Sequence, residues 1–105
     1  MTSTDEATYD RPFAIRVEAL SSTHTLLLSG EFDSNAAEQL RHVLESALAT
    51  STKVVLDVGG VTFIDSSTLN VLVAARQQET PYQITRGNRV VDRLLELTGL
   101  TFMYE

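Results

Sequence analysis

The chain is expected to form one α/β domain. It should contain a mixed, mostly parallel sheet of about five strands, with helices packed on it and an antiparallel hairpin at its N-terminal end. Its 105 residues, 43% hydrophobic and 21% charged, fit a single globular domain. Short β-branched and apolar runs alternate with segments whose apolar residues recur at helical spacing. This alternation favours crossovers between parallel strands, whereas the short connection between the first two strands favours a hairpin.

The first ten residues differ in character from the rest of the chain. They are polar and acidic, and they lack the apolar stretch of a signal peptide. We expect a mobile acidic tail at residues 1–10 and the folded domain at residues 11–105. No apolar run approaches the roughly 20 residues that cross a bilayer, so no membrane insertion is expected. The absence of cysteine fits the reducing cytoplasm.

The domain is predicted to begin with two strands and a helix. Residues 13–19 place apolar side chains on one face, residues 21–24 form a turn, and residues 25–30 are a second apolar strand. Ser34 or Asn35 is expected to cap the helix that follows. The apolar residues of this helix lie three and four apart and form one stripe: Ala36, Ala37, Leu40, Val43, Leu44, Ala47 and Leu48.

A strand and a second helix are predicted next. Residues 53–58 are β-branched and mostly apolar, as in strands buried on both faces. Gly59-Gly60 is expected to break this strand before residues 61–64 extend again. The second helix follows directly and is expected to end at Thr80-Pro81.

The last part of the chain repeats the alternation. Residues 82–85 form a short strand, and Asn88 opens a third helix that Gly99 ends. Residues 100–104 alternate in polarity and are predicted to be the final strand.

Charge and motif content exclude several functions. The net charge is −6, with only eight lysines and arginines, so a nucleic-acid partner is not expected. The only histidines are His24 and His42, in a turn and a helix, and neither a G-x-S-x-G elbow nor a phosphate-binding loop is present. We therefore expect no catalytic residue and no cofactor.

Three aspartates near the ends of predicted strands are candidate magnesium ligands. A magnesium site like that of phospho-receiver domains would require Asp33, Asp57 and Asp65 to converge. Asp57 lies inside a predicted strand, and no suitable lysine follows. Helix caps and loop acids are therefore the favoured interpretation, and no metal site is expected.

Two acid-bearing loops follow predicted strands. The segment DSST, residues 65–68, begins the second helix, and the segment GEFD, residues 30–33, ends an earlier strand. Asp65 or Ser66 is a natural helix cap. However, α/β domains present functional loops at the carboxyl ends of parallel strands, so both segments should open onto one edge of the sheet. They are a candidate binding surface.

Three segments in order resemble the anti-sigma factor antagonist family, the STAS domains. GEFD at residues 30–33 is similar to the element after the second strand of that family. VTFIDSS at residues 61–67 is similar to its phosphorylation motif, and VDRLLELTGL at residues 91–100 to its last helix and turn. The resemblance covers residues 13–104 and implies a STAS-like fold.

The resemblance implies a regulatory protein without catalysis of its own. In that family the unmodified antagonist binds an anti-sigma factor that is also a serine kinase, a GHKL-type ATPase, and this frees a sigma factor. The kinase phosphorylates the antagonist and inactivates it, and a phosphatase reverses the modification. Carried onto this chain, the phosphoacceptor is Ser66. The partner-binding candidates are Glu31, Asp33, Asp65, Ser67, Thr68 and Asn70. A monomer or a weak homodimer is expected.

One position departs from the family pattern. Thr68 stands where the family usually has glycine after the second serine. A branched side chain is expected to crowd a partner's backbone there. This favours an alternative, a STAS accessory subunit of a lipid or anion transporter that docks without phosphorylation. A scaffold or small-ligand sensor would instead require an exposed apolar patch near Leu69 and Val73.

Overall fold

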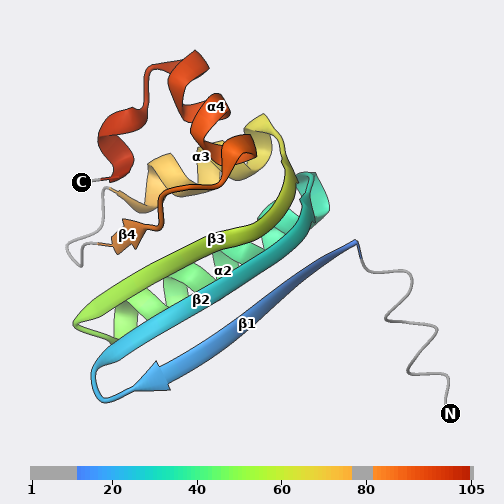
Figure 1. The fold of residues 1–105 in the computed structure, drawn as a ribbon. Coiled ribbons are helices and arrows are strands. Elements are labelled where there is room, and N and C mark those ends of the chain that lie inside the picture. Colours follow the sequence, from blue (N-terminus) through green and yellow to red (C-terminus); the bar gives the residue numbers. More distant parts are fainter. Residues whose placement is uncertain (1–11, 77–81, 105) are drawn as a thin grey trace, which may run out of the picture.

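The computed structural model describes residues 12–76 and 82–104, so the predicted mobile tail lies outside the described residues. The prediction that the second helix ends at Thr80-Pro81 is wrong, because this helix ends at Ala75 and Arg76 is its C-cap. Figure 1 shows the arrangement of the elements. Their bounds are β1 Phe13–Leu20, β2 Thr23–Phe32, α2 Ser34–Thr50, β3 Lys53–Ile64, α3 Ser66–Ala75, β4 Tyr82–Ile84, α4 Arg89–Thr98 and a final 3-10 helix, η1, Thr101–Tyr104.

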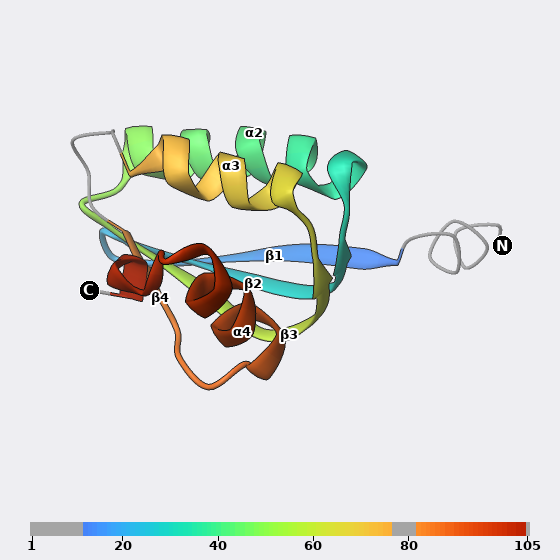
Figure 2. The same cartoon turned by 90° about the horizontal axis from the view of Figure 1, so that it is seen from above.

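The described strands form one mixed sheet in the order β1-β2-β3-β4. β1 and β2 form the expected antiparallel hairpin, and β2, β3 and β4 run parallel to one another. Helices α2 and α3 cover one face of the sheet, and α4 packs against β3 from the other face (Figure 2). The α/β class, the mixed sheet and the N-terminal hairpin are thus confirmed.

The core lies mainly between the sheet and the pair α2 and α3. Every stripe position predicted for α2 is buried except Val43, which is half-buried. The largest side chains with almost no exposed surface include Phe32, Leu26, Leu40, Leu44, Leu56, Leu72, Leu95 and Met103. The buried Tyr82 hydroxyl donates a hydrogen bond to the Leu72 carbonyl, which joins β4 to α3. Burial raises the pKa of Tyr82, so the hydroxyl keeps the proton that it donates.

The prediction of about five strands is wrong, because the sheet has four strands within the described residues. Residues 100–104, expected to be a strand, form η1 instead. Gly99 adopts a left-handed conformation with φ 74°, and the Leu100 amide returns to the Leu95 carbonyl at 2.8 Å. Met103 then donates to the Leu100 carbonyl at 3.0 Å and has no exposed surface. The chain therefore turns back locally and does not extend beside a neighbour.

The predicted break at Gly59-Gly60 is also wrong, since β3 continues through both glycines as a bulged strand. The Asn88 side chain holds the bulge. Its amide nitrogen donates to the Val58 carbonyl at 2.7 Å and to the Val61 carbonyl at 2.9 Å. Its amide oxygen accepts from the Val91 amide at 3.1 Å and so caps α4, as expected. One side chain therefore fixes both the irregular strand and the helix beside it.

None of the helices within residues 12–76 and 82–104 combines the length and the hydropathy of a membrane-spanning segment.

Candidate functional site

The two acid-bearing loops lie side by side at one edge of the sheet. Phe32 and Ile64, the last residues of the parallel strands β2 and β3, are paired in register. The Asp65 amide donates to the Phe32 carbonyl at 3.1 Å, which joins the two loops directly. Helices α2 and α3 therefore start next to each other (Figure 2). We call this edge, formed by residues 31–35 and 63–67, the rim.

Both rim aspartates cap helices. The Asp65 side chain accepts from the Ser67 amide at 3.0 Å and from the Thr68 amide at 3.2 Å. The Asp33 side chain accepts from the Ala36 amide at 3.1 Å, so the expectation that Ser34 or Asn35 caps α2 is wrong. Asp33 has an extended backbone, φ −91° and ψ −167°, which lets its carboxylate reach the first turn. Asp33 and Asp65 therefore stabilise the starts of α2 and α3, independently of any role in binding.

Ser66 is the first residue of α3, and its side chain is exposed on the rim. Its neighbour Ser67 is half-buried, and Asn70, one turn further along, is exposed. A hydroxyl at this position is open to a visiting protein. It also lies at the positive end of the helix dipole, where a negative group is tolerated.

The rim is acidic. Glu31 and Asp33 are exposed, and Asp65 is half-buried. Neither residues 30–40 nor residues 61–75 contain a lysine or arginine. A partner that docks here therefore meets negative charge with no neighbouring positive charge from the same segments.

Thr68 is not part of this exposed surface. Its side chain is 1% exposed, and its hydroxyl donates to the Phe32 carbonyl at 3.1 Å. The expectation that a branched residue here crowds a partner is therefore wrong, because the side chain is buried and its hydroxyl faces the end of β2. Thr68 instead gives the rim a second bond between α3 and the end of β2.

A Thr68→Val variant is expected to lose about 1 kcal/mol of folding free energy, because one buried hydrogen bond disappears while the shape is kept. The Phe32 carbonyl still accepts from the Asp65 amide, so it is not left without a partner. Thermal unfolding of both proteins measures the difference. A loss above about 3 kcal/mol would mean that the hydroxyl does more than this bond explains.

Phe63 is a rim residue that the sequence reasoning missed. It is 47% exposed, two residues before Asp65, and it pairs with Glu31 in the sheet register. Residues 61–64 were predicted only to be extended, and no exposure was predicted for Phe63. The register of β3 against β2 is irregular twice, at Gly59-Gly60 and at Thr62, so the side that faces inward changes twice before Phe63, and no local pattern gives those changes.

Steric crowding explains why a glycine occupies position 30, the first residue of the segment GEFD. Gly30 has φ 90°, and a Cβ atom built on it would lie 1.9 Å from the Pro12 carbonyl oxygen. The same Pro12 oxygen accepts a hydrogen bond from the Glu31 amide at 2.8 Å. The start of β1 thus passes directly over Gly30, which positions the residues that lead into the rim.

Neither histidine lies at the rim. The His24 ring is hydrogen-bonded to the Ser51 hydroxyl beyond the far end of α2, and the exposed His42 lies 3.3 Å from Glu38. Asp57 is likewise remote: it pairs with Leu27, and its carboxylate accepts from the Gly59 amide at 3.0 Å. Across residues 12–76 and 82–104, no group of three or more acidic or histidine side chains is placed to hold a metal ion.

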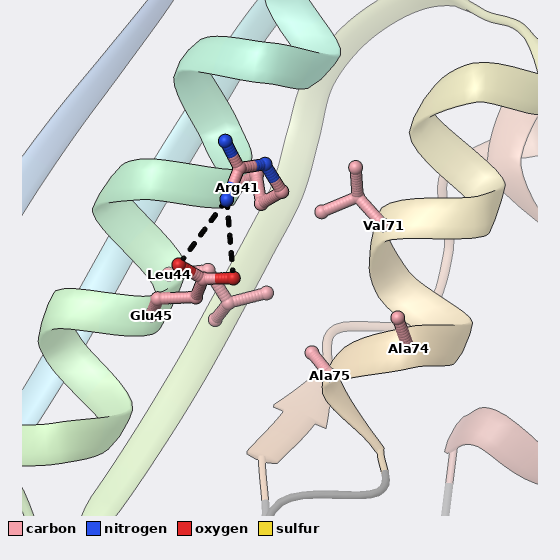
Figure 3. A pocket seen from close by; sticks show the side chains of 6 residues that line it. All are labelled: Arg41, Leu44, Glu45, Val71, Ala74 and Ala75. Carbon is pink, nitrogen blue, oxygen red and sulfur yellow. Dashed lines mark hydrogen bonds and ion pairs between the residues drawn. The ribbon is translucent and has the colours of Figure 1, made fainter.

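A small cleft separates α2 from α3 (Figure 3). Arg41 and Glu45 of α2 form an ion pair on one side at 3.4 Å, and Val71, Ala74 and Ala75 of α3 line the other. Its volume is about 60 Å³, well below the roughly 300 Å³ at which small-molecule sites begin. The cleft is a seam between helices, and the rim remains the candidate site.

Comparisons with known proteins identify the family and the fold. Residues 15–104 match the family model described as Mlab, STAS domain. Among solved structures, an anti-sigma factor antagonist from Mycobacterium paratuberculosis is 25% identical and has a TM-score of 0.78. The alignment covers 88% of this chain and 82% of that one. No curated protein matches the sequence significantly.

Two structures of the anti-sigma factor antagonist SpoIIAA share the fold. The unphosphorylated form is 21% identical with a TM-score of 0.72, over 86% of this chain and 84% of that one. The phosphorylated form, described as a Bacillus cell fate determinant, is 20% identical with a TM-score of 0.69, over 86% and 87%.

Proposed function

This chain belongs to the STAS domain family, and we propose that within it the chain acts as an anti-sigma factor antagonist switched by phosphorylation of Ser66. The observation that carries the proposal is an exposed serine that begins α3, directly after its capping aspartate, on a rim shared with the start of α2. The similar protein SpoIIAA has been solved in a phosphorylated form, which supports a switch of this kind.

Unmodified, the chain binds an anti-sigma factor through the rim and so releases a sigma factor. The anti-sigma factor is also a serine kinase of the GHKL ATPase type. It transfers the γ-phosphoryl group of ATP to the Ser66 hydroxyl oxygen, with loss of the hydroxyl proton and release of ADP. A phosphatase hydrolyses the ester and restores the hydroxyl. The chain itself catalyses neither step.

Phosphorylation is expected to change docking and leave the fold intact. A phosphate on Ser66 adds about −1.5 to −2 charges beside Asp65, at the positive end of α3. The helix end tolerates that charge, whereas a partner surface that covers a neutral hydroxyl would bury it without compensation. Such burial costs at least about 2 kcal/mol, and about 1.4 kcal/mol already means tenfold in affinity.

The partner contacts follow from exposure on and beside the rim. Glu31, Asp33 and Asp65 offer carboxylates, and Ser67 and Asn70 offer polar groups along α3. Phe63 adds an exposed aromatic surface beside Glu31. We expect the partner to present basic side chains around an apolar contact. Thr68 is left out of this set because its side chain is buried.

The direct test incubates the chain with candidate anti-sigma kinases and ATP and maps the phosphate by mass spectrometry. We expect one phosphate on Ser66, and none in a Ser66→Ala variant. Ser67→Ala is the matched control, since it removes the neighbouring half-buried hydroxyl and should remain a substrate. Phosphate on another residue, or none with any candidate kinase, contradicts the proposal.

The contact role of the acids can be separated from their capping role. Asp33→Asn and Asp65→Asn keep a side-chain oxygen for the cap but remove the charge, so unfolding free energy should change by less than about 1 kcal/mol. Affinity for the anti-sigma factor should fall roughly tenfold for each variant. Asp57→Asn, on the sheet away from the rim, serves as the control. Equal affinities for all three variants would show that Asp33 and Asp65 do not contribute to docking.

A second candidate function is an accessory subunit of a lipid or anion transporter. The family model that matches is described as Mlab and not as an anti-sigma factor antagonist, so family membership leaves this candidate standing. Affinity purification of the chain separates the two. Recovery of a transporter ATPase subunit, together with an unmodified Ser66, favours the accessory role, and recovery of a serine kinase favours the sigma switch.

A further inference from the structure

The first strand is an open edge of the sheet. β1 pairs with β2 on one side, and within residues 12–76 and 82–104 no strand pairs with its other side (Figure 1). Val17 is 45% exposed although its neighbours Phe13 and Ile15 pack against the core. A strand of eight residues with an exposed apolar centre is a template for pairing with another chain.

The backbone of β1 determines which residues offer hydrogen bonds outward. The Pro12 carbonyl points at β2, where it accepts from the Glu31 amide, and the hairpin register continues unbroken to Leu20 opposite Thr23. Since alternate residues of an antiparallel pair bond inward, the even-numbered residues of β1 face β2. The N–H and C=O groups of Phe13, Ile15, Val17 and Ala19 therefore point outward.

We propose that a second copy of this chain pairs with the outer edge of β1, antiparallel and centred on Val17. A two-fold axis there makes the contact self-complementary. Val17 then faces Val17 of the other copy, and Ile15 faces Ala19, each with outward backbone groups that can bond. The two sheets join into one.

Charge complementarity selects this register. Arg16 and Glu18 lie on the same face of β1, with side chains 70% and 59% exposed, and within one chain they form an exposed ion pair with each other at 3.3 Å. Pairing of two copies lets them exchange partners. Around Val17, each Arg16 lies opposite a Glu18 of the other copy, twice in one contact. Moving the axis to Ile15 or Ala19 places the charged residues opposite Ala14 or Leu20 and loses both ion pairs. Facing pairs that are not hydrogen-bonded bring side chains closest, which suits an ion pair.

The pairing leaves the rim free. Because the two β1 strands run antiparallel, the carboxyl ends of β2 and β3 lie at opposite ends of the joined sheet. Each copy keeps its own Ser66 exposed. Self-association through β1 therefore does not depend on whether Ser66 is phosphorylated or on which partner the rim binds.

Sedimentation equilibrium of the full chain from about 10 µM to about 1 mM tests the pairing. We expect a monomer–dimer equilibrium for the natural sequence. Arg16→Glu alone places glutamate opposite glutamate twice, and Glu18→Arg alone places arginine opposite arginine. Each should weaken self-association at least about tenfold.

Two further samples test the register itself. The double variant Arg16→Glu/Glu18→Arg restores both ion pairs and should regain self-association. An equimolar mixture of the two single variants should form a heterodimer that neither forms alone. Melting temperatures of every variant should match the natural protein, since both side chains are exposed.

Amide hydrogen exchange gives an independent readout. With rising protein concentration the amides of Ile15, Val17 and Ala19 should become protected, whereas those of Arg16 and Glu18 are protected at all concentrations by the hairpin. A natural protein that stays monomeric at about 1 mM overturns the proposal. So does a dimer that is insensitive to the single charge reversals, which would place the contact elsewhere.

Discussion

Replacing Ser66 by aspartate is expected to weaken binding of the anti-sigma factor about 100-fold and to leave the melting temperature within about 4 °C. The fixed charge imitates part of the phosphate at the start of α3. The side chain is exposed and acids are favourable in the first helical turn, so the fold should accept it. Calorimetry with the purified partner gives the affinity, and thermal unfolding gives the stability.

Ser34→Asp is the matched control for this change. Ser34 is the first residue of α2 and is exposed on the same rim, so the variant adds the same charge at the equivalent position of the neighbouring helix. We expect a loss of affinity well below that of Ser66→Asp. Equal losses would mean that any added negative charge on the rim blocks docking. A large drop in the stability of Ser66→Asp would contradict a switch that acts on binding alone.

Replacing Gly30 by alanine is expected to destabilise the fold by at least about 3 kcal/mol. The new Cβ would lie 1.9 Å from the Pro12 carbonyl oxygen, which is backbone and can move only with the start of β1. The left-handed φ of 90° adds strain for any residue with a side chain. For a domain of this size the melting temperature should fall by more than about 10 °C.

Gly99→Ala separates the two causes. Gly99 also has a positive φ of 74°, but a Cβ there would meet no atom within 4 Å. Only backbone strain remains, which costs about 1 kcal/mol. If thermal unfolding gave similar losses for both variants, the close passage of β1 over Gly30 would not be the reason for this glycine.

The helical part of the fold followed from spacing within short stretches of chain. The apolar stripe of α2 gave its buried face, and Asn88 and Gly99 gave the ends of α4. These features depend on residues within one or two helical turns of each other. The adjacency of the two acid-bearing loops also followed, because consecutive parallel strands place their carboxyl ends together.

Two strand predictions failed, one because of neighbouring residues and one because of a distant residue. Residues 100–104 alternate like a strand, yet the left-handed Gly99 and the buried Met103 turn them into η1. Gly59-Gly60 looks like a break, yet Asn88, about 30 residues later in sequence, bonds the bulge and keeps β3 continuous. The contact between Asn88 and β3 cannot be identified from the sequence of β3 alone.

At the rim, too, some features follow from local sequence and others from long-range packing. Local sequence was sufficient to place an aspartate cap and a run of hydroxyls at the start of a helix, because capping involves atoms only a few residues apart. Which hydroxyl of that run is exposed depended on the Phe32 carbonyl of the neighbouring strand, 36 residues away from Thr68 in sequence. That bond turns Thr68 inward, while Ser66 remains on the exposed side of the helix start. Long-range packing therefore decided which side chains a partner can reach.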